Sequence, residues 1–157
     1  MTVKSIEGIE TTVQKTNIWI NDIADEIGWT DRHAAYLALK AVLQTLRERL
    51  TPEETADLSA QLPLLVRGIF FEGWRPSKQP VKYDRTEFIA HVRSYFNQWP
   101  EINGETVIRA VFKVMAKRIA EGEVCDIVSI LPGEMCPLWE EPGQQVNKAK
   151  PLAGRLD

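Results

Sequence analysis

The sequence is poor in the residues that most often build covalent or metal frameworks. Its 157 residues include only two cysteines and two histidines. Cys125 and Cys136 match no metal-ligand spacing, and two thiols in a reducing compartment are more often packed or free than bridged. A fold stabilised by disulfides or a structural metal is therefore not expected, and we predict neither a metal nor another cofactor.

Long apolar runs are also missing. The first residues, MTVKSIEGIETTVQKTN, contain no apolar stretch of signal-peptide length, and no later segment approaches the roughly 18 uninterrupted apolar residues of a spanning helix. These absences predict a cytoplasmic protein with no membrane partner. The net charge of −3 argues against a general nucleic-acid binder, whose binding surface is normally basic, although it leaves a local basic patch open.

What the chain does contain is an ordinary supply of apolar residues with helical spacing. Hydrophobic residues make up 44% and charged residues 26% of the sequence, values that fit a folded domain with a sizeable core. No strand-like alternation of apolar and polar residues occurs. The sequence therefore predicts an all-α fold.

The two halves of the chain share one pattern. DLSAQLP begins at residue 57 and DIVSILP at residue 126, which sets an offset of 126 − 57 = 69 residues. At this offset, the apolar positions of residues 19–63 coincide with those of the second half without a gap. Eight of these 45 pairs are identical: Ile20/Ile89, Ala41/Ala110, Val42/Val111, Arg49/Arg118, Glu54/Glu123, Asp57/Asp126, Leu62/Leu131 and Pro63/Pro132. We therefore expect a helical bundle of two tandem three-to-four-helix repeats packed with pseudo-twofold symmetry, although the turn at 28–36 matches poorly.

Start and stop signals divide the first half into helices. A first helix is expected over about 12–28, ending near Gly28, and Thr30 is expected to cap a second helix that runs to about Leu50. The segment Thr51-Pro52-Glu53-Glu54 has a capping-box pattern and starts a third helix, to about Gln61. Because proline disfavours the α conformation in the residue before it, Leu62 should be a bend followed by a short fourth helix.

The second half has equivalent signals. Asp84 and Glu87 form another capping-box pattern, Asn103 can cap the helix that contains Val107, and Leu131 should form the second bend before proline. Glycine and two prolines mark the intervening segment as a linker. The expected organisation is a first repeat at 12–72, a linker at 73–83, a second repeat at 84–139 and a flexible tail at 140–157 that lacks apolar periodicity.

Catalytic groups are scarce. His33 lies in the first turn of an expected helix and His91 beside an apolar position of another, where a surface or capping side chain is the ordinary interpretation. Neither cysteine has an activating neighbour in the sequence, and no Gly-rich phosphate loop or helical metal motif is present. We therefore predict that the protein is not an enzyme and has no catalytic residues.

One stretch, RGIFFEGWRPSKQPVKYDR at 67–85, combines basic and aromatic residues. Arg67, Trp74 and Arg75 are its candidate ligand-binding or partner-binding residues, because guanidinium groups beside an indole can recognise an anion or a flat ring. The alternative is that the aromatic residues fasten the linker onto the bundle while the charges stay in solvent. The sequence leaves both interpretations open.

Three segments carry a resemblance to a known family. They are VQKTNIWINDIADEIGW, AYLALKAVLQTLRERLTPEETADLSAQLPLLVRGIFFEGWRP and VFKVMAKRIAEGEVCDIVSILPGEMCPLW, and they span about residues 12–139. In these segments the chain resembles the bacterial domain-of-unknown-function family 2267. The resemblance implies a bacterial origin and an all-helical domain, and it implies no activity or binding residue.

Two functions from different classes follow from these observations. The first is a protein-interaction or scaffold module that binds itself or an unknown protein partner through surface left over after the helices pack. The alternative is a sensor or carrier for a small anionic or aromatic ligand, with a site at the repeat junction near Arg67, Trp74 and Arg75. Nucleic-acid binding is not expected.

Overall fold

The computed structural model describes residues 4–140, and this part of the chain is built from helices without a β-strand. The all-α prediction is therefore confirmed. The predicted flexible tail lies, from residue 141 onward, outside the described residues. The division into repeats at 12–72 and 84–139 stays a prediction.

The first helix, α1 (Glu7–Ile27), ends where the sequence predicts and begins earlier. Gly28 adopts the left-handed conformation (φ 82°), and its N–H donates to Ala24 O at 2.8 Å. The predicted start near residue 12 is wrong by five residues. The cause is that Ile6, the residue before the helix, offers no capping side chain that would mark the start.

The second helix, α2 (Arg32–Arg49), is capped by Asp31 rather than by the predicted Thr30. Asp31 Oδ1 accepts from His33 N at 2.9 Å and from Ala34 N at 3.2 Å. The capping box of Thr51 and Glu54 is confirmed at the start of α3 (Pro52–Ser59), and α4 spans Leu64–Phe71. The bend before proline is confirmed, since neither helix includes Leu62.

The second half combines α-helices with 3₁₀ elements. After a 3₁₀ turn η1 (Pro76–Lys78) come α5 (Arg85–Arg93), η2 (Ser94–Phe96), α6 (Gly104–Arg118), α7 (Glu121–Ile130) and η3 (Gly133–Trp139). Asp84 with Glu87 forms the predicted capping box, and Asn103 caps α6. The bend at Leu131 is confirmed too, but the element after it is 3₁₀ rather than α-helical; Pro137 lies inside it and removes one backbone donor.

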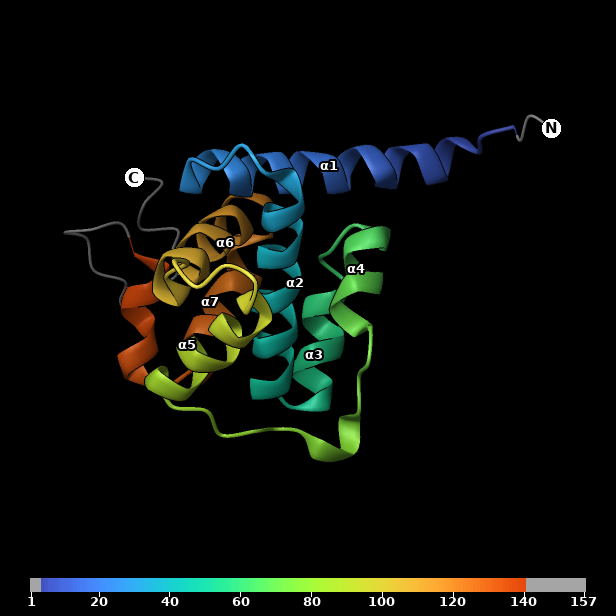
Figure 1. Cartoon of the computed structure of the whole chain (residues 1–157). Coiled ribbons are helices and arrows are strands. Elements are labelled where there is room, and N and C mark those ends of the chain that lie inside the picture. The colour runs from blue at the N-terminus through green and yellow to red at the C-terminus, as the bar shows by residue number, and fades with distance from the viewer. Residues whose placement is uncertain (1–3, 141–157) are drawn as a thin grey trace, which may run out of the picture.

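The core is organised around α2, which contacts α1, α4, α5 and α6 (Figure 1). One side of α2 carries small buried side chains that allow neighbouring helices to approach closely: Ala34, Ala35, Ala38 and Ala41. Large buried residues of both halves, including Leu39, Phe70, Phe88 and Phe112, belong to one continuous hydrophobic cluster. In Figure 1, α1 lies across one end of this bundle and its N-terminal part extends beyond it.

Candidate functional site

Arg67, the first predicted binding residue, is engaged with the backbone. It lies on α4, and its guanidinium donates from Nε to Ser59 O at 2.9 Å and from Nη2 to Leu62 O at 3.1 Å. These carbonyls belong to the end of α3 and to the following bend, where helical partners are missing. Arg67 therefore holds α4 against the end of α3.

Trp74, the second predicted residue, lies in the linker and is half-buried. Its indole N–H donates to Gln79 Oε1 at 2.6 Å, and its ring packs against Phe71 with a centroid distance of 5.0 Å. The amide nitrogen of Gln79 donates in turn to Leu50 O at 3.0 Å and to Thr55 Oγ1 at 2.7 Å. The linker is thus fastened to the end of α2 and to α3.

Arg75, the third predicted residue, is exposed at the start of η1. Within residues 4–140, its side chain has no hydrogen bond or ion pair. No hydrogen bond, ion pair or ring contact of this described part joins Arg67, Trp74 and Arg75 to one another. Their role in binding a ligand stays a prediction, while the contacts of Trp74 agree with the linker interpretation.

A half-buried histidine lies between α2 and α5. Thr45 donates its hydroxyl proton to Ala41 O at 2.7 Å, so its oxygen accepts from His91 Nδ1 at 2.9 Å. Burial lowers the pKa of His91; Glu48 opposes this effect and Arg47 adds to it. The imidazole also stacks on Tyr83 at 5.2 Å. These contacts join the two helices and give His91 a structural role.

Arg47 is a buried charge in the same region. Its Nη1 donates to Phe70 O and to Glu72 O, both at 2.8 Å, and its Nε lies 3.4 Å from Glu48 Oε2. Gln44 donates to Ile69 O at 2.9 Å. The polar residues of α2 therefore satisfy the carbonyls at the end of α4, which would otherwise lack partners.

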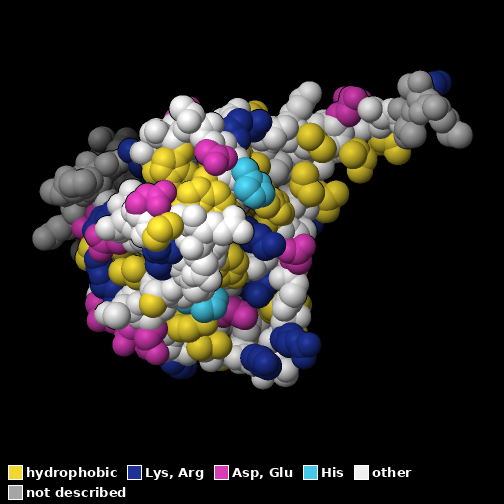
Figure 2. Space-filling model, viewed as in Figure 1, with side chains coloured by type: hydrophobic (Ala, Val, Ile, Leu, Met, Phe, Trp, Pro, Cys, Tyr) yellow, Lys and Arg dark blue, Asp and Glu magenta, His cyan; other side chains and the backbone are white. Residues whose placement is uncertain are grey.

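The protruding part of α1 carries exposed apolar side chains. One face of α1, together with the residue before the helix, is formed by residues spaced alternately three and four apart. They are Ile6, Ile9, Val13, Thr16, Ile20, Ile23 and Ile27. Its last members pack in the bundle, whereas Ile6 is 70%, Ile9 53% and Val13 41% exposed. Figure 2 shows hydrophobic side chains along the underside of this protruding segment.

The start of α4 continues this apolar surface. Leu65 N donates to Thr12 Oγ1 at 2.9 Å, which brings the first turn of α4 against α1. Leu64 and Leu65 are 59% and 42% exposed. A shallow groove runs between Gly8 and Thr12 of α1 and Pro63 and Leu64. We call the surface formed by Ile6, Ile9, Val13, Leu64 and Leu65 the overhang face.

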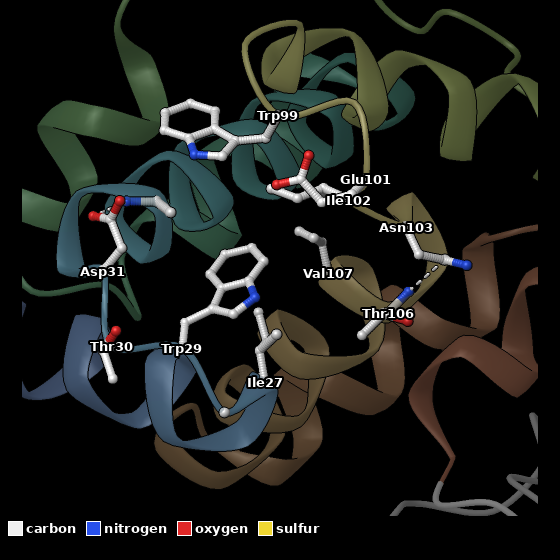
Figure 3. Close-up of a pocket in the computed structure, with 12 residues that line it drawn as sticks. Ile27, Trp29, Thr30, Asp31, Trp99, Glu101, Ile102, Asn103, Thr106 and Val107 are labelled. Atoms are coloured by element: carbon white, nitrogen blue, oxygen red, sulfur yellow. Dashed lines mark hydrogen bonds between the residues drawn. The ribbon is translucent and has the colours of Figure 1, made fainter.

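A second feature is a pocket of about 510 Å³ between two inter-helix turns (Figure 3). One turn joins α1 to α2 and contributes Trp29 and Asp31; the other precedes α6 and contributes Trp99 and Glu101. Figure 3 shows the two indoles on either side of the opening, with the apolar side chain of Val107 next to Trp29. Both tryptophans pack edge-on against one buried ring, that of Phe96, at centroid distances of 6.2 Å.

Sequence reasoning missed this pocket although a signal was present. The first turn reads Trp29-Thr30-Asp31 and the second reads Trp99-Pro100-Glu101, so each has a tryptophan two residues before an acid. These motifs are 99 − 29 = 70 residues apart, whereas the repeat offset is 69. The fixed offset therefore compared Trp29 with Gln98 and concealed the match.

Metal and membrane features are not found in the described part of the chain. No three His, Cys, Asp or Glu side chains of residues 4–140 are grouped so that they could hold a metal ion. Within the same residues, none of the helices combines the length and hydropathy needed to cross a bilayer.

Comparison with known families gives one match. A family model described as an uncharacterized conserved protein, DUF2267, matches residues 16–138. These residues include both turns of the pocket and most of the bundle. No curated protein matches the chain.

Proposed function

The chain belongs to the DUF2267 family of uncharacterized conserved proteins, and we propose that it is a protein-interaction module that binds a second copy of itself through the overhang face. The observation that carries this proposal is the apolar stripe of α1, which continues past the bundle with three large side chains at least 41% exposed. Exposed apolar residues that occur singly are ordinary, but a contiguous set on one helix and its neighbour marks an interaction surface.

The shape of the overhang face favours a second copy as the partner. The protruding part of α1 carries an apolar stripe along one side, and it meets the start of α4 at a corner. One two-fold operation would lay the protruding helix of each copy along that of the other and direct its Ile6 toward the partner's α4. A self-complementary contact of this kind closes after two copies.

The energetics of burying the overhang face allow a weak dimer. Completing the burial of a half-exposed Ile, Leu or Val recovers about 1 kcal/mol, half of the gain for full burial. A symmetric contact buries five such side chains from each copy and recovers on the order of 10 kcal/mol, comparable to the ~4–15 kcal/mol cost of association. The five side chains are uncharged, and the groove beside them adds one acid and one base, Glu7 and Lys15.

The test compares two isoleucines on opposite faces of α1. Ile18 is 43% exposed, close to the 53% of Ile9, and nine residues at 100° each place it half a turn away. By sedimentation equilibrium, the wild-type protein should dimerise with a Kd of roughly tens to hundreds of micromolar, as expected when the gain on burial is set against an association cost near the lower end of its range. Ile9→Glu should weaken dimerisation at least tenfold, whereas Ile18→Glu should leave it unchanged.

Circular dichroism should show the same helix content in both variants, because both positions are exposed and glutamate is a good helix former. A wild-type protein that stays monomeric at several hundred micromolar would overturn the proposal. A dimer that Ile9→Glu leaves intact would also overturn it, because the contact would then lie elsewhere.

We also infer that the two halves derive from one repeated unit. Support comes from boundaries at the same offset: α2 and α6 end at Arg49 and Arg118 (118 − 49 = 69), and α3 and α7 begin at Pro52 and Glu121 (121 − 52 = 69). Superposition of residues 19–70 on residues 88–139 tests this inference. Helix directions that do not superpose would contradict a pseudo-twofold arrangement.

The bacterial origin, the cytoplasmic location and the absence of enzymatic activity stay predictions. The alternative function, a ligand site at Arg67, Trp74 and Arg75, is also still a prediction. Its test is Arg75→Ala, which should abolish binding of an anionic ligand or partner while changing stability by less than about 1 kcal/mol, because Arg75 is exposed. Arg67→Ala would in addition remove the two hydrogen bonds that hold α4 against the end of α3.

A further inference from the structure

The pocket between the two turns is lined largely by aromatic and apolar side chains. Two indoles, those of Trp29 and Trp99, line it together with apolar side chains such as Ile102 and Val107. Its volume of about 510 Å³ lies within the range of small-molecule sites. Neither indole N–H has a hydrogen-bond partner in the described part of the chain, and both rings are only half-buried. The rings therefore offer aromatic surface to a molecule in the pocket.

The ionisable groups that line the pocket are both acidic. Among the described lining residues only Asp31 and Glu101 are ionisable, and no lysine or arginine lines the pocket. Asp31 uses Oδ1 to cap α2. Glu101 is exposed and has no ion pair within residues 4–140. An anionic ligand would meet two carboxylates, whereas a cation would meet both carboxylates and two electron-rich indole rings.

We propose that this pocket binds a small organic cation, one whose nitrogen carries alkyl groups. Alkylated ammonium ions bind over indole faces because the ring quadrupole attracts the charge while the alkyl groups replace water on apolar surface. A nearby carboxylate adds attraction without requiring a hydrogen bond. Each half of the chain supplies one tryptophan and one acid in the same order, so the site is completed only when both turns come together.

The experiment uses tetramethylammonium as the probe and the full chain as the protein. The five tryptophans give indole N–H signals that NMR can follow one by one. Titration at constant ionic strength should shift the signals of Trp29 and Trp99 saturably in the millimolar range, and should leave that of Trp74 unchanged. tert-Butanol, a neutral molecule of similar shape, should bind at least tenfold more weakly, and inorganic phosphate should produce no saturable shift.

Two variants and one matched control complete the test. Glu101→Gln should weaken tetramethylammonium binding at least threefold without changing the melting temperature, and Trp99→Leu should abolish the saturable shift of Trp29. Glu53→Gln removes another exposed carboxylate, on α3, and should bind like the wild type. Equal binding of tert-butanol, an unchanged Glu101→Gln variant, or equal shifts of all five indoles would each overturn the proposal.

Discussion

The two parts of α1 carry one apolar stripe but have different surroundings. Ile20 and Ile23 are 8% and 0% exposed because α2 and α6 cover them, while Ile9 on the same stripe is 53% exposed. The spacing of apolar residues is the same in both parts. The comparison shows that periodicity specifies which face of a helix is apolar, but the neighbouring elements decide whether that face is core or contact surface.

The largest expected effect is a difference in stability between the two parts. Ile23→Ala should lower the free energy of unfolding by about 2–5 kcal/mol, because it removes methyl groups from a fully buried site. Ile9→Ala should change it by less than about 0.5 kcal/mol, measured by urea unfolding at low protein concentration. Similar losses in both variants would mean that the protruding part is also packed in the monomer.

A smaller effect is expected where the two parts meet. Thr12→Val removes the acceptor of Leu65 N and should cost about 0.5–1 kcal/mol, since one amide of the first turn of α4 loses its protein partner. Thr11→Val is the matched control, because Thr11 Oγ1 donates only to Glu7 O in its own helix. If urea unfolding gives equal values for the two variants, Thr12 does not help to hold α4 against α1.

The smallest expected effect is a dependence of stability on pH. It compares a half-buried histidine, His91, with an exposed one, His33. The pKa of His91 is lowered by burial, so the unfolded chain binds its proton more readily than the folded one. The contribution of neutral His91 to the free energy of unfolding is therefore fully present above the unfolded pKa of about 6.5. It is lost as the pH falls through the lower folded pKa.

This pH dependence can be assigned by substitution. His91→Asn should reduce the loss of urea stability between pH 7.5 and pH 5.5, whereas His33→Asn at an exposed position should not. A wild-type slope that survives in His91→Asn would assign it to other groups. Glu123 is not among them, because burial raises the pKa of that carboxyl and a raised pKa makes the folded chain more stable, not less, as the pH falls.

The sequence predicted the elements wherever a local side chain specifies them. Both capping boxes, at Thr51 and Asp84, and both bends before proline are found as expected, because their causes lie within four residues. The start of α1 was missed because Ile6 has no capping group. Thr30 and Asp31 are both good caps, and only the geometry of the turn selected Asp31.

The sites were harder to predict than the elements. The pocket depends on two turns separated by 70 residues, and proximity of that kind is decided by how α1, α2 and α6 pack rather than by local sequence. The exposed stripe of α1 was not predicted either, since the same spacing is ordinary for a buried helix. For Trp74, the sequence offered two interpretations, and its contact with Gln79 supports the linker one.

The hydrogen bonds of Gln79, which fasten the linker to the first half, bear on the order of folding. Gln79 contacts Leu50 and Thr55, which precede it by 29 and 24 residues, whereas the bond between Arg118 and Asp22 spans 96 residues. Closing a short loop costs less chain entropy than closing a long one. We therefore expect the first half to secure its own linker while the second half is still unfolded, so that α5 and α6 are delivered to a surface of α2 that already exists.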